Sequence, residues 1–335
     1  MATIKDVAKR AGVGVGTVSR VIVGSAPVSA ETAMRVRRAI AELRFRPSHA
    51  ARVLQKGQSQ TIGVFAPLVH GAFYTPILHT IYTTLRSYGR HMVVDFGQSR
   101  ESERQDALDG VEFLTDRGCD GLLVMGTALK PADIDRIAEL QPNFVLLNRR
   151  TPRFRAQCFA PNHEAAGAAV AHALCDSGHR RLAVIEGPRD SADNRQRMRG
   201  FRSALAERGI DPESVPYEQG DFSPESGRTA AQTLLARGCK FTALFCANDE
   251  MAIGALAGLS QMGLSVPGDL SVMGYDGIDL TALTVPPLTT VLIPWQQIVT
   301  HALHHLLNLC YGMSLPVERD IPAQVLWRES LARRS

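Results

Sequence analysis

The stretch TIKDVAKRAGVGVGTVSRVI, from Thr3 to Ile22, decides the fold of the amino-terminal region. Its apolar residues first recur at the spacing of an α-helix behind Thr3, which can cap that helix, and Gly12 ends the pattern. A second apolar stripe of the same period begins after only Gly12-Val13-Gly14, so the two short helices must meet at a tight angle. This spacing is typical of a helix-turn-helix motif.

A third helix is predicted after Ser29, a second candidate cap, with an apolar face from Ala33 to Leu43. Three such helices can enclose a small core. The first sixty residues carry eleven lysines and arginines against three acidic residues, a net charge of +8, whereas the rest of the chain carries −4. A basic helical module on an acidic body favours a polyanion-binding head, because clustered cations displace counterions from phosphates. A solubilising charge run is the alternative.

The second helix would enter the major groove of DNA, with those residues at its start that the core does not need facing the base edges. These are Val15, Gly16 and Arg20. Arg20 could read a guanine through its fork of donors, and Val15 could contact a thymine methyl group. Thr17 and Ser19 are better placed for phosphates.

A fourth, conditional helix follows the third. Pro47 ends the third helix, and Ser48 can begin another that is too short to be stable alone in water. Two copies packed side by side on a duplex could insert Leu54 as an apolar wedge into the minor groove. An ordinary linker with an isolated leucine fits the sequence equally well. We place the headpiece at residues 1–46, the hinge helix and linker at 47–60 and a larger body at 61–335.

The amino-terminal region resembles a known family over Ala2–Val13, Thr17–Ile22, Arg46-Pro47 and Ala51–Leu54. These segments are similar to the headpiece and hinge helix of the lactose/galactose repressor family. Gly14, Gly16 and Val23 depart from the usual family pattern, and a glycine N-cap costs only about a few tenths of a kcal/mol relative to serine. The resemblance implies a double-stranded, pseudo-palindromic operator as partner. The predicted DNA-binding set is Thr3, Val15, Gly16, Thr17, Ser19, Arg20, Ser29 and Leu54.

The body alternates continuous apolar runs with helical stretches. The runs are Ile62–Phe65, Met92–Phe96, Gly121–Met125, Phe144–Leu147, Leu182–Ile185, Thr242–Cys246 and Leu270–Met273, and the helices lie near 75–88, 101–117, 163–177, 194–208, 225–237 and 249–262. Such alternation predicts an α/β fold with parallel sheets covered on both faces. Seven strands exceed one comfortable core, so two lobes are expected, with a ligand cleft between them at the carboxyl ends of the strands.

Polar residues that follow these strands are the candidate ligand contacts. They are Asn148, Asn248, Asp249 and Asp276, with Arg197 as a further donor and the rings of Phe73, Tyr74 and Phe222. Fixed hydrogen-bonding groups beside aromatic faces suit a sugar, whose hydroxyls and C–H faces they would meet. Helix capping for Asn248 and Asp249, a turn for Asp276 and a solvated helix face for Arg197 are the plain alternatives.

The body also resembles the effector-binding core of the same repressors, over Ser177–Arg181, Arg197–Phe201, Gly220–Gly227, Cys246–Leu256, Gly274–Asp276 and Pro287–Thr290. The resemblance implies a two-lobed, periplasmic-binding-protein-like core that forms a homodimer or a tetramer. It implies a repressor of a carbohydrate-utilisation operon, similar to the galactose-repressor branch and to repressors of β-glucoside operons. Asn148 replaces a carboxylate that is common in the family. A corepressor-type regulator of a non-sugar metabolite, or a sugar-binding protein with nonspecific DNA affinity, is the alternative.

Other classes of protein lack their usual signals. The six cysteines include no Cys-x-x-Cys pair, and no apolar run approaches the ~18 residues of a membrane span. Nucleophile-elbow, His-Glu-x-x-His and Walker A motifs are missing, and the Gly12-x-Gly14-x-Gly16 spacing follows a helix rather than the strand that a dinucleotide loop needs. His301, His304 and His305 suit packing or surface positions better than metal binding. We expect a cytoplasmic regulator that is not an enzyme and has no cofactor, metal or membrane partner.

Overall fold

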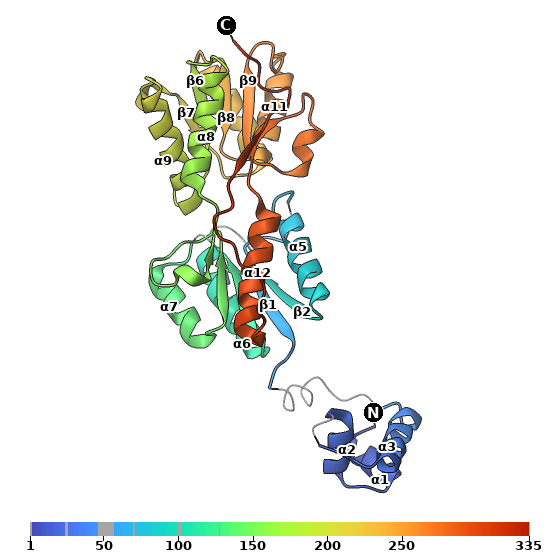
Figure 1. Ribbon diagram of the computed structural model, residues 1–335. Coiled ribbons are helices and arrows are strands. Elements are labelled where there is room, and N and C mark those ends of the chain that lie inside the picture. The colour runs from blue at the N-terminus through green and yellow to red at the C-terminus, as the bar shows by residue number, and fades with distance from the viewer. Residues whose placement is uncertain are drawn as a thin grey trace. The chain divides into compact units, whose positions relative to one another are not determined.

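A computed structural model describes residues 2–23, 26–45, 57–69, 71–98, 102–126 and 128–334 of the chain (Figure 1). The chain divides into two compact units, Met1–Thr61 and Ile62–Ser335. Most of the predicted hinge, including Pro47 and Leu54, lies outside the described residues. The boundaries of headpiece, hinge and body therefore stay predictions.

The smaller unit contains the three predicted helices, α1 (Ile4–Ala11), α2 (Val15–Val23) and α3 (Ala30–Glu42). Thr3 caps α1 reciprocally: the Asp6 amide donates to its hydroxyl, and its own amide donates to the Asp6 carboxylate. Gly12 ends α1 in the left-handed region at φ 65°, where glycine carries no steric penalty. The core of this unit consists of Val7, Ala8, Ala11, Val18, Val36 and Ala39.

The first lobe of the larger unit is built on a five-stranded sheet in the order β2-β1-β3-β4-β5 (Figure 1). Its strands are β1 (Thr61–Ala66), β2 (His91–Phe96), β3 (Gly121–Met125), β4 (Phe144–Leu147) and β5 (Cys158–Phe159), and its helices are α5 (Tyr74–Ser87), α6 (Glu103–Asp116) and α7 (Pro131–Leu140). Strands β1, β3, β4 and β5 run parallel. The buried side chains of β1, β3 and β4 explain their continuous apolar runs.

The second lobe is built on a six-stranded sheet in the order β11-β10-β9-β8-β6-β7. Its strands are β6 (Leu182–Glu186), β7 (Tyr217–Gln219), β8 (Ala243–Cys246), β9 (Ser271–Asp276), β10 (Thr289–Leu292) and β11 (Gln324–Leu326), and its helices are α8 (His163–Asp176), α9 (Ala192–Glu207), α10 (Pro224–Ala236) and α11 (Asp249–Gln261). The strand β11 is antiparallel to β10, and the other pairs are parallel. Helix α12 (Trp295–Tyr311) returns to pack on the first lobe, against α5 and the strands β3, β4 and β5 (Figure 1).

The predicted α/β class, with parallel sheets and a helix-turn-helix headpiece, is confirmed. Each predicted apolar run coincides with a strand to within one residue at its start, and each predicted helical stretch of the body coincides with a helix to within a few residues. The patterns missed β5, β7, β10 and β11, which have two to four residues each and so show no readable period, and they missed α7. No helix in the described part of the chain combines the length and the apolar character that a membrane crossing needs.

Two glycines bring the backbones of α8 and α9 into direct contact. A Cβ atom on Gly167 of α8 would overlap the carbonyl oxygen of Arg197, and one on Gly200 of α9 would overlap the carbonyl oxygen of Glu164. Larger residues would force the two helices apart. The glycines therefore determine how closely α8 and α9 approach each other, and both helices contribute residues to the site below.

Candidate DNA-binding surface and effector cavity

The predicted DNA-reading residues are gathered on α2. Val15, Gly16 and Arg20 are exposed, Thr17 and Ser19 are half-buried, and Val18 is buried in the core of the smaller unit. This division between core and surface is the one that the apolar period predicts.

The two other predicted DNA contacts, Thr3 and Ser29, are exposed and serve as helix caps. The hydroxyl of Ser29 accepts a hydrogen bond from the amide of Thr32 at 3.4 Å. The structure thus gives both residues a local role, and their contact with DNA stays a prediction.

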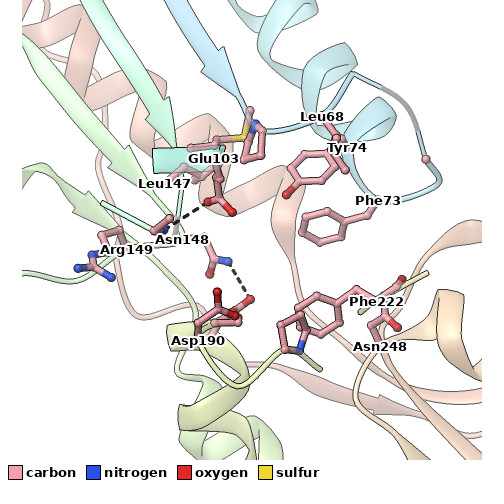
Figure 2. Close-up of a pocket in the computed structure, with 18 of the residues that line it drawn as sticks. Leu68, Phe73, Tyr74, Glu103, Leu147, Asn148, Arg149, Asp190, Phe222 and Asn248 are labelled. Carbon is pink, nitrogen blue, oxygen red and sulfur yellow. Dashed lines mark hydrogen bonds between the residues drawn. The ribbon is translucent and has the colours of Figure 1, made fainter. Parts of the chain in front are cut away.

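The larger unit contains a cavity of about 790 Å³ that residues of both lobes line (Figure 2). Figure 2 shows the first-lobe rings of Phe73 and Tyr74 above the second-lobe side chains of Phe222 and Asn248. Seven of the eight predicted effector contacts line it: Phe73, Tyr74, Asn148, Arg197, Phe222, Asn248 and Asp276. The carboxyl ends of the strands in both sheets bring them together, as expected for a ligand site in parallel sheets.

Arg197 is a buried cation in the cavity wall. Its side chain is 2% exposed, and its guanidinium carbon lies 3.6 Å from the centroid of the Tyr275 ring. The Nη2 atom lies 4.0 Å from the carboxylate of Asp193, while Nε and Nη1 have no hydrogen-bond partner among the described residues. The solvated helix face that the sequence left open is thereby excluded. Buried donors without acceptors are costly, so the cavity favours a ligand that carries acceptor oxygens.

Asp276 ends strand β9 at the cavity. It is 8% exposed and has a positive φ of 113°, an unusual backbone conformation for a residue other than glycine. Burial raises the pKa of its carboxyl group well above the ordinary value, although the guanidinium of Arg197 acts in the opposite direction. A carboxyl group in this setting suits hydrogen bonds to ligand hydroxyls.

Asn248 and Asp249 separate into two roles. The side-chain oxygen of Asn248 accepts from the Met251 amide at 2.9 Å and caps α11, and its Nδ2 donates to the Phe222 carbonyl at 3.0 Å. Asn248 is therefore both a cap and part of the cavity wall.

Asp249, in contrast, does not line the cavity. It is fully buried, and its carboxylate accepts from the amides of Gly277 and Ile278 and from the hydroxyl of Thr290. Burial raises its pKa to about 7, and these hydrogen bonds oppose the shift. The structure thus corrects the expected effector contact: Asp249 fastens the segment after β9 to α11 and β10.

A chain of hydrogen bonds that the sequence did not reveal joins the two lobes at Asn148. Its Nδ2 donates to Asp193 at 3.2 Å, its Oδ1 lies 2.8 Å from Nε2 of His163, and Nδ1 of His163 lies 2.8 Å from the hydroxyl of Tyr275. Asn148 adopts φ 58°, a left-handed conformation that asparagine tolerates. The spacing of Asp193 four residues before Arg197 could have indicated that both share one helix face.

The protonation states of His163 and Asp193 depend on their burial and on the charge of Arg197. Burial lowers the pKa of His163 to about 3, so the imidazole is neutral. Burial alone would raise the pKa of Asp193, but the guanidinium of Arg197 and the hydrogen bonds from Ser191 and the Asn194 amide outweigh it and hold this pKa below the ordinary value. Asp193 is therefore a carboxylate that can only accept hydrogen bonds.

Two further cavity residues were not predicted. The Nε1 atom of Trp295, at the start of α12, is buried without a hydrogen-bond partner in the described residues, and its ring packs edge-on against Phe73 at 5.3 Å. Glu250 accepts a hydrogen bond from the Ala72 amide at 2.8 Å and makes a second contact between the lobes. Trp295 lies at the start of α12 and Glu250 in the first turn of α11. Only the tertiary fold brings these two turns to the cavity.

The late histidines of α12 are engaged in packing. Nδ1 of His304 lies 2.8 Å from the Pro316 carbonyl, and its Nε2 lies 3.1 Å from the hydroxyl of Tyr88. Within the described ranges, no group of three or more potential ligands is placed to hold a metal ion.

Comparison with known proteins assigns both parts of the chain. Residues 3–48 match the model of the lacI family of bacterial regulatory proteins, and residues 171–331 match that of the periplasmic binding protein-like domain. The HTH-type transcriptional regulator AscG of Escherichia coli K12 is 34% identical over 99% of this chain and 98% of its own length. The chain belongs to the LacI family. It is accordingly a transcriptional regulator and not an enzyme, as the sequence predicts.

Solved structures of LacI-family proteins extend the likeness to the whole chain. The lac repressor dimer bound to operator and the anti-inducer ONPF is 29% identical, with a TM-score of 0.85 over 99% of both chains. The complex of the transcriptional regulator CelR with cellobiose is 28% identical, with a TM-score of 0.71 over 98% of this chain and 100% of that one. The resemblance inferred from the sequence is confirmed at the level of the family.

Proposed function

We propose that this LacI-family chain represses a carbohydrate-utilisation operon and that a small sugar in the cavity controls its affinity for the operator. The buried donors of the cavity carry this proposal. Nε and Nη1 of Arg197 and Nε1 of Trp295 have no acceptors among the described residues, and acceptor oxygens of a bound ligand would satisfy them. The carboxyl group of Asp276 and the ring of Phe222 line the same cavity. Donors, carboxyl oxygens and an aromatic face together match the hydroxyls and C–H faces of a sugar.

The size of the cavity supports a sugar or a glycoside. A volume of about 790 Å³ lies within the range of small-molecule sites, roughly 300 to 1,000 Å³. One solved relative, CelR, was solved as a complex with cellobiose. We infer that the effector of this chain is a neutral mono- or disaccharide, or a glycoside.

Control of DNA binding requires two lobe arrangements. A sugar can shift the balance only through a difference in its affinity for the two arrangements, a coupling typically of about 1 to 3 kcal/mol. We propose that the sugar releases the operator. We also propose that two headpieces read the half-sites of a near-palindrome in the cytoplasm, with paired hinge segments at 47–60 placing Leu54 in the minor groove.

The test begins with operator selection from random duplexes by the full-length protein. Fluorescence anisotropy on the selected duplex is then measured with cellobiose, D-galactose, D-ribose, methyl β-D-glucoside and D-gluconate. We expect one neutral sugar to weaken operator binding by about five- to 150-fold, the usual range of allosteric coupling. Absence of sequence preference, or operator binding that no compound changes, would refute the proposal, and tightened binding would refute induction.

Arg20 is expected to read one base in each half-site. Arg20→Ala should reduce discrimination at that position by ~1 to 3 kcal/mol, because a bidentate contact to guanine is lost. The measurement is anisotropy against the selected operator and a set of single-base variants. Arg37→Ala, which removes the same charge from the exposed face of α3, should lower affinity for all duplexes alike. An equal loss for Arg20→Ala on operator and random DNA would contradict the base contact.

An exposed apolar cluster supports a homodimer. Leu280, Leu283 and Val285, in the segment after β9, are 49%, 77% and 94% exposed. Arg328 donates to Thr281 and Leu288, which places the 58%-exposed Trp327 beside the same segment. We infer that these exposed apolar side chains form an interaction surface.

Leu283→Asp should therefore weaken the dimer about 100-fold or more, because a carboxylate would have to be desolvated in the interface. Sedimentation velocity over a concentration series measures the shift to monomer. Leu140→Asp, at a 41%-exposed position on α7, is the matched control and should leave the dimer intact. If both variants sediment as the wild type does, the interface lies elsewhere.

A further inference from the structure

The amide of Asn148 is held between two side chains of the opposite lobe. Asn148 follows β4 in the first lobe, whereas His163 begins α8 and Asp193 lies in the first turn of α9 in the second lobe. Asn148 and Asp193 line the cavity. His163 is not among the cavity-lining residues, and it is 2% exposed.

The donor and acceptor in each of these three hydrogen bonds can be assigned in one consistent way. Asp193 is ionised and can only accept, so Nδ2 of Asn148 must donate to it. The Oδ1 atom of Asn148 then faces His163 and needs a donor, so the proton of the neutral imidazole is on Nε2. Nδ1 of His163 is left as the acceptor of the Tyr275 hydroxyl proton.

We propose that His163 is a positioning residue for effector recognition, which fixes the orientation of the Asn148 amide and ties the two lobes together through it. In this orientation the second Nδ2–H of Asn148 remains available as a donor beside the second lone pair of Oδ1. A carboxylate at the same position would offer acceptors only. His163, which does not itself line the cavity, thus determines which way the Asn148 amide faces, and this role depends on the cavity being the effector site proposed above.

Packing is the alternative role for His163. Its ring stacks on Tyr275 at 6.0 Å between centroids and lies 6.5 Å from the ring of Trp295. A residue that only fills this space could be replaced by leucine. A residue that orients Asn148 could be replaced by glutamine, whose amide carries both a donor group and an acceptor oxygen, and not by leucine.

Hydrogen–deuterium exchange of the full-length protein without any sugar separates these roles. Opening of the contact between Asn148 and His163 exposes the segment 144–150. In this segment the backbone N–H of Asn148 donates to the Phe159 carbonyl at 2.8 Å. We expect His163→Leu to speed exchange in this segment about tenfold and His163→Gln to stay within about twofold of the wild type. Asn148→Ala should reproduce the leucine variant, and the double variant should add nothing further.

Two outcomes would overturn the proposal: wild-type exchange in His163→Leu, or additive effects of His163→Leu and Asn148→Ala. If His163→Leu fails to fold, Tyr275→Phe removes only the hydroxyl donor and should loosen the same segment. An unchanged segment in that variant would equally refute the chain of hydrogen bonds.

The protonation state gives a second, direct readout. In protein labelled with ¹⁵N-histidine, the resonance that disappears in His163→Gln should show a bare Nδ1 and a protonated Nε2 at pH 7. A protonated Nδ1 would overturn the proposal. Because no sugar is present in either experiment, failure of the sugar panel would refute the proposed effector while leaving these results to be judged separately.

Discussion

Gly200→Val should separate helices α8 and α9 and remove the ordered cavity, with a loss of about 4 kcal/mol or more in the free energy of unfolding. The reason is that a side chain at this position overlaps the carbonyl oxygen of Glu164, which is backbone and cannot turn aside as a flexible side chain would. Thermal and urea unfolding followed by circular dichroism measures the loss.

The matched control is Ala206→Val, which introduces the same β-branched residue at an exposed position of the same helix. Ala206→Val should lower the free energy of unfolding by the difference in helix propensity between alanine and valine. Any further change should be less than about 0.5 kcal/mol. Gly200→Ala offers a second test, since helix propensity alone predicts a gain of up to ~1 kcal/mol and the overlap predicts a loss. A stabilised Gly200→Ala protein would show that the two helices do not touch at this point.

Arg197→Met should abolish the response to the effector sugar while operator binding persists. Methionine keeps the length of the side chain but removes the donors Nε and Nη1, which have no other acceptors in the described chain. Loss of two charge-assisted hydrogen bonds should weaken the sugar by ~3 kcal/mol or more, which is at least about 100-fold. Calorimetry with the sugar that binds the wild type, and anisotropy on the operator, measure the two effects.

Arg199→Met is the matched control, because Arg199 is on the same helix and its side chain is 66% exposed. It should bind the sugar as the wild type does. Retained sugar response in Arg197→Met would remove Arg197 from the effector site.

The same substitution should also reverse the pH dependence that Asp193 contributes. In the wild type its pKa lies below the ordinary value, so its contribution to stability is lost as the pH falls. Without Arg197, burial raises the pKa above the ordinary value, and stability is then lost as the pH rises. The deficit of Arg197→Met relative to the wild type should therefore grow as the pH rises above the ordinary carboxyl pKa of 3.8 and disappear when Asp193→Asn is added.

Local patterns were sufficient for the headpiece helices and for most of the buried strands and helices of the body. The caps Thr3 and Ser29 and the apolar period located the headpiece helices, and continuous apolar runs located the strands that are buried on both faces. Short strands such as β5 and β7 escaped, because two or three residues cannot show a period and their pairing partners are distant in the sequence.

The cavity was predictable only in part. Residues that follow strands, such as Asn148 and Asp276, could be found because parallel strands deliver their carboxyl ends to one edge. Asp249 stands next to Asn248 in the sequence, yet the first turn of α11 directs it into the core. His163 and Trp295 carry no local signal, since each reaches the site from a segment that passes between the lobes.

The sequence by itself determined the helix-turn-helix headpiece, the two-sheet α/β body and the family, because caps, periods and motifs are properties of neighbouring residues. Only the tertiary structure decided which charges are buried together. The helix contact at Gly167 and Gly200 brings α8 and α9 together, and their residues His163 and Asp193 contact Asn148 of the other lobe, with Arg197 beside Asp193. Burial and charge pairing depend on distances through space, and a linear pattern does not contain those distances.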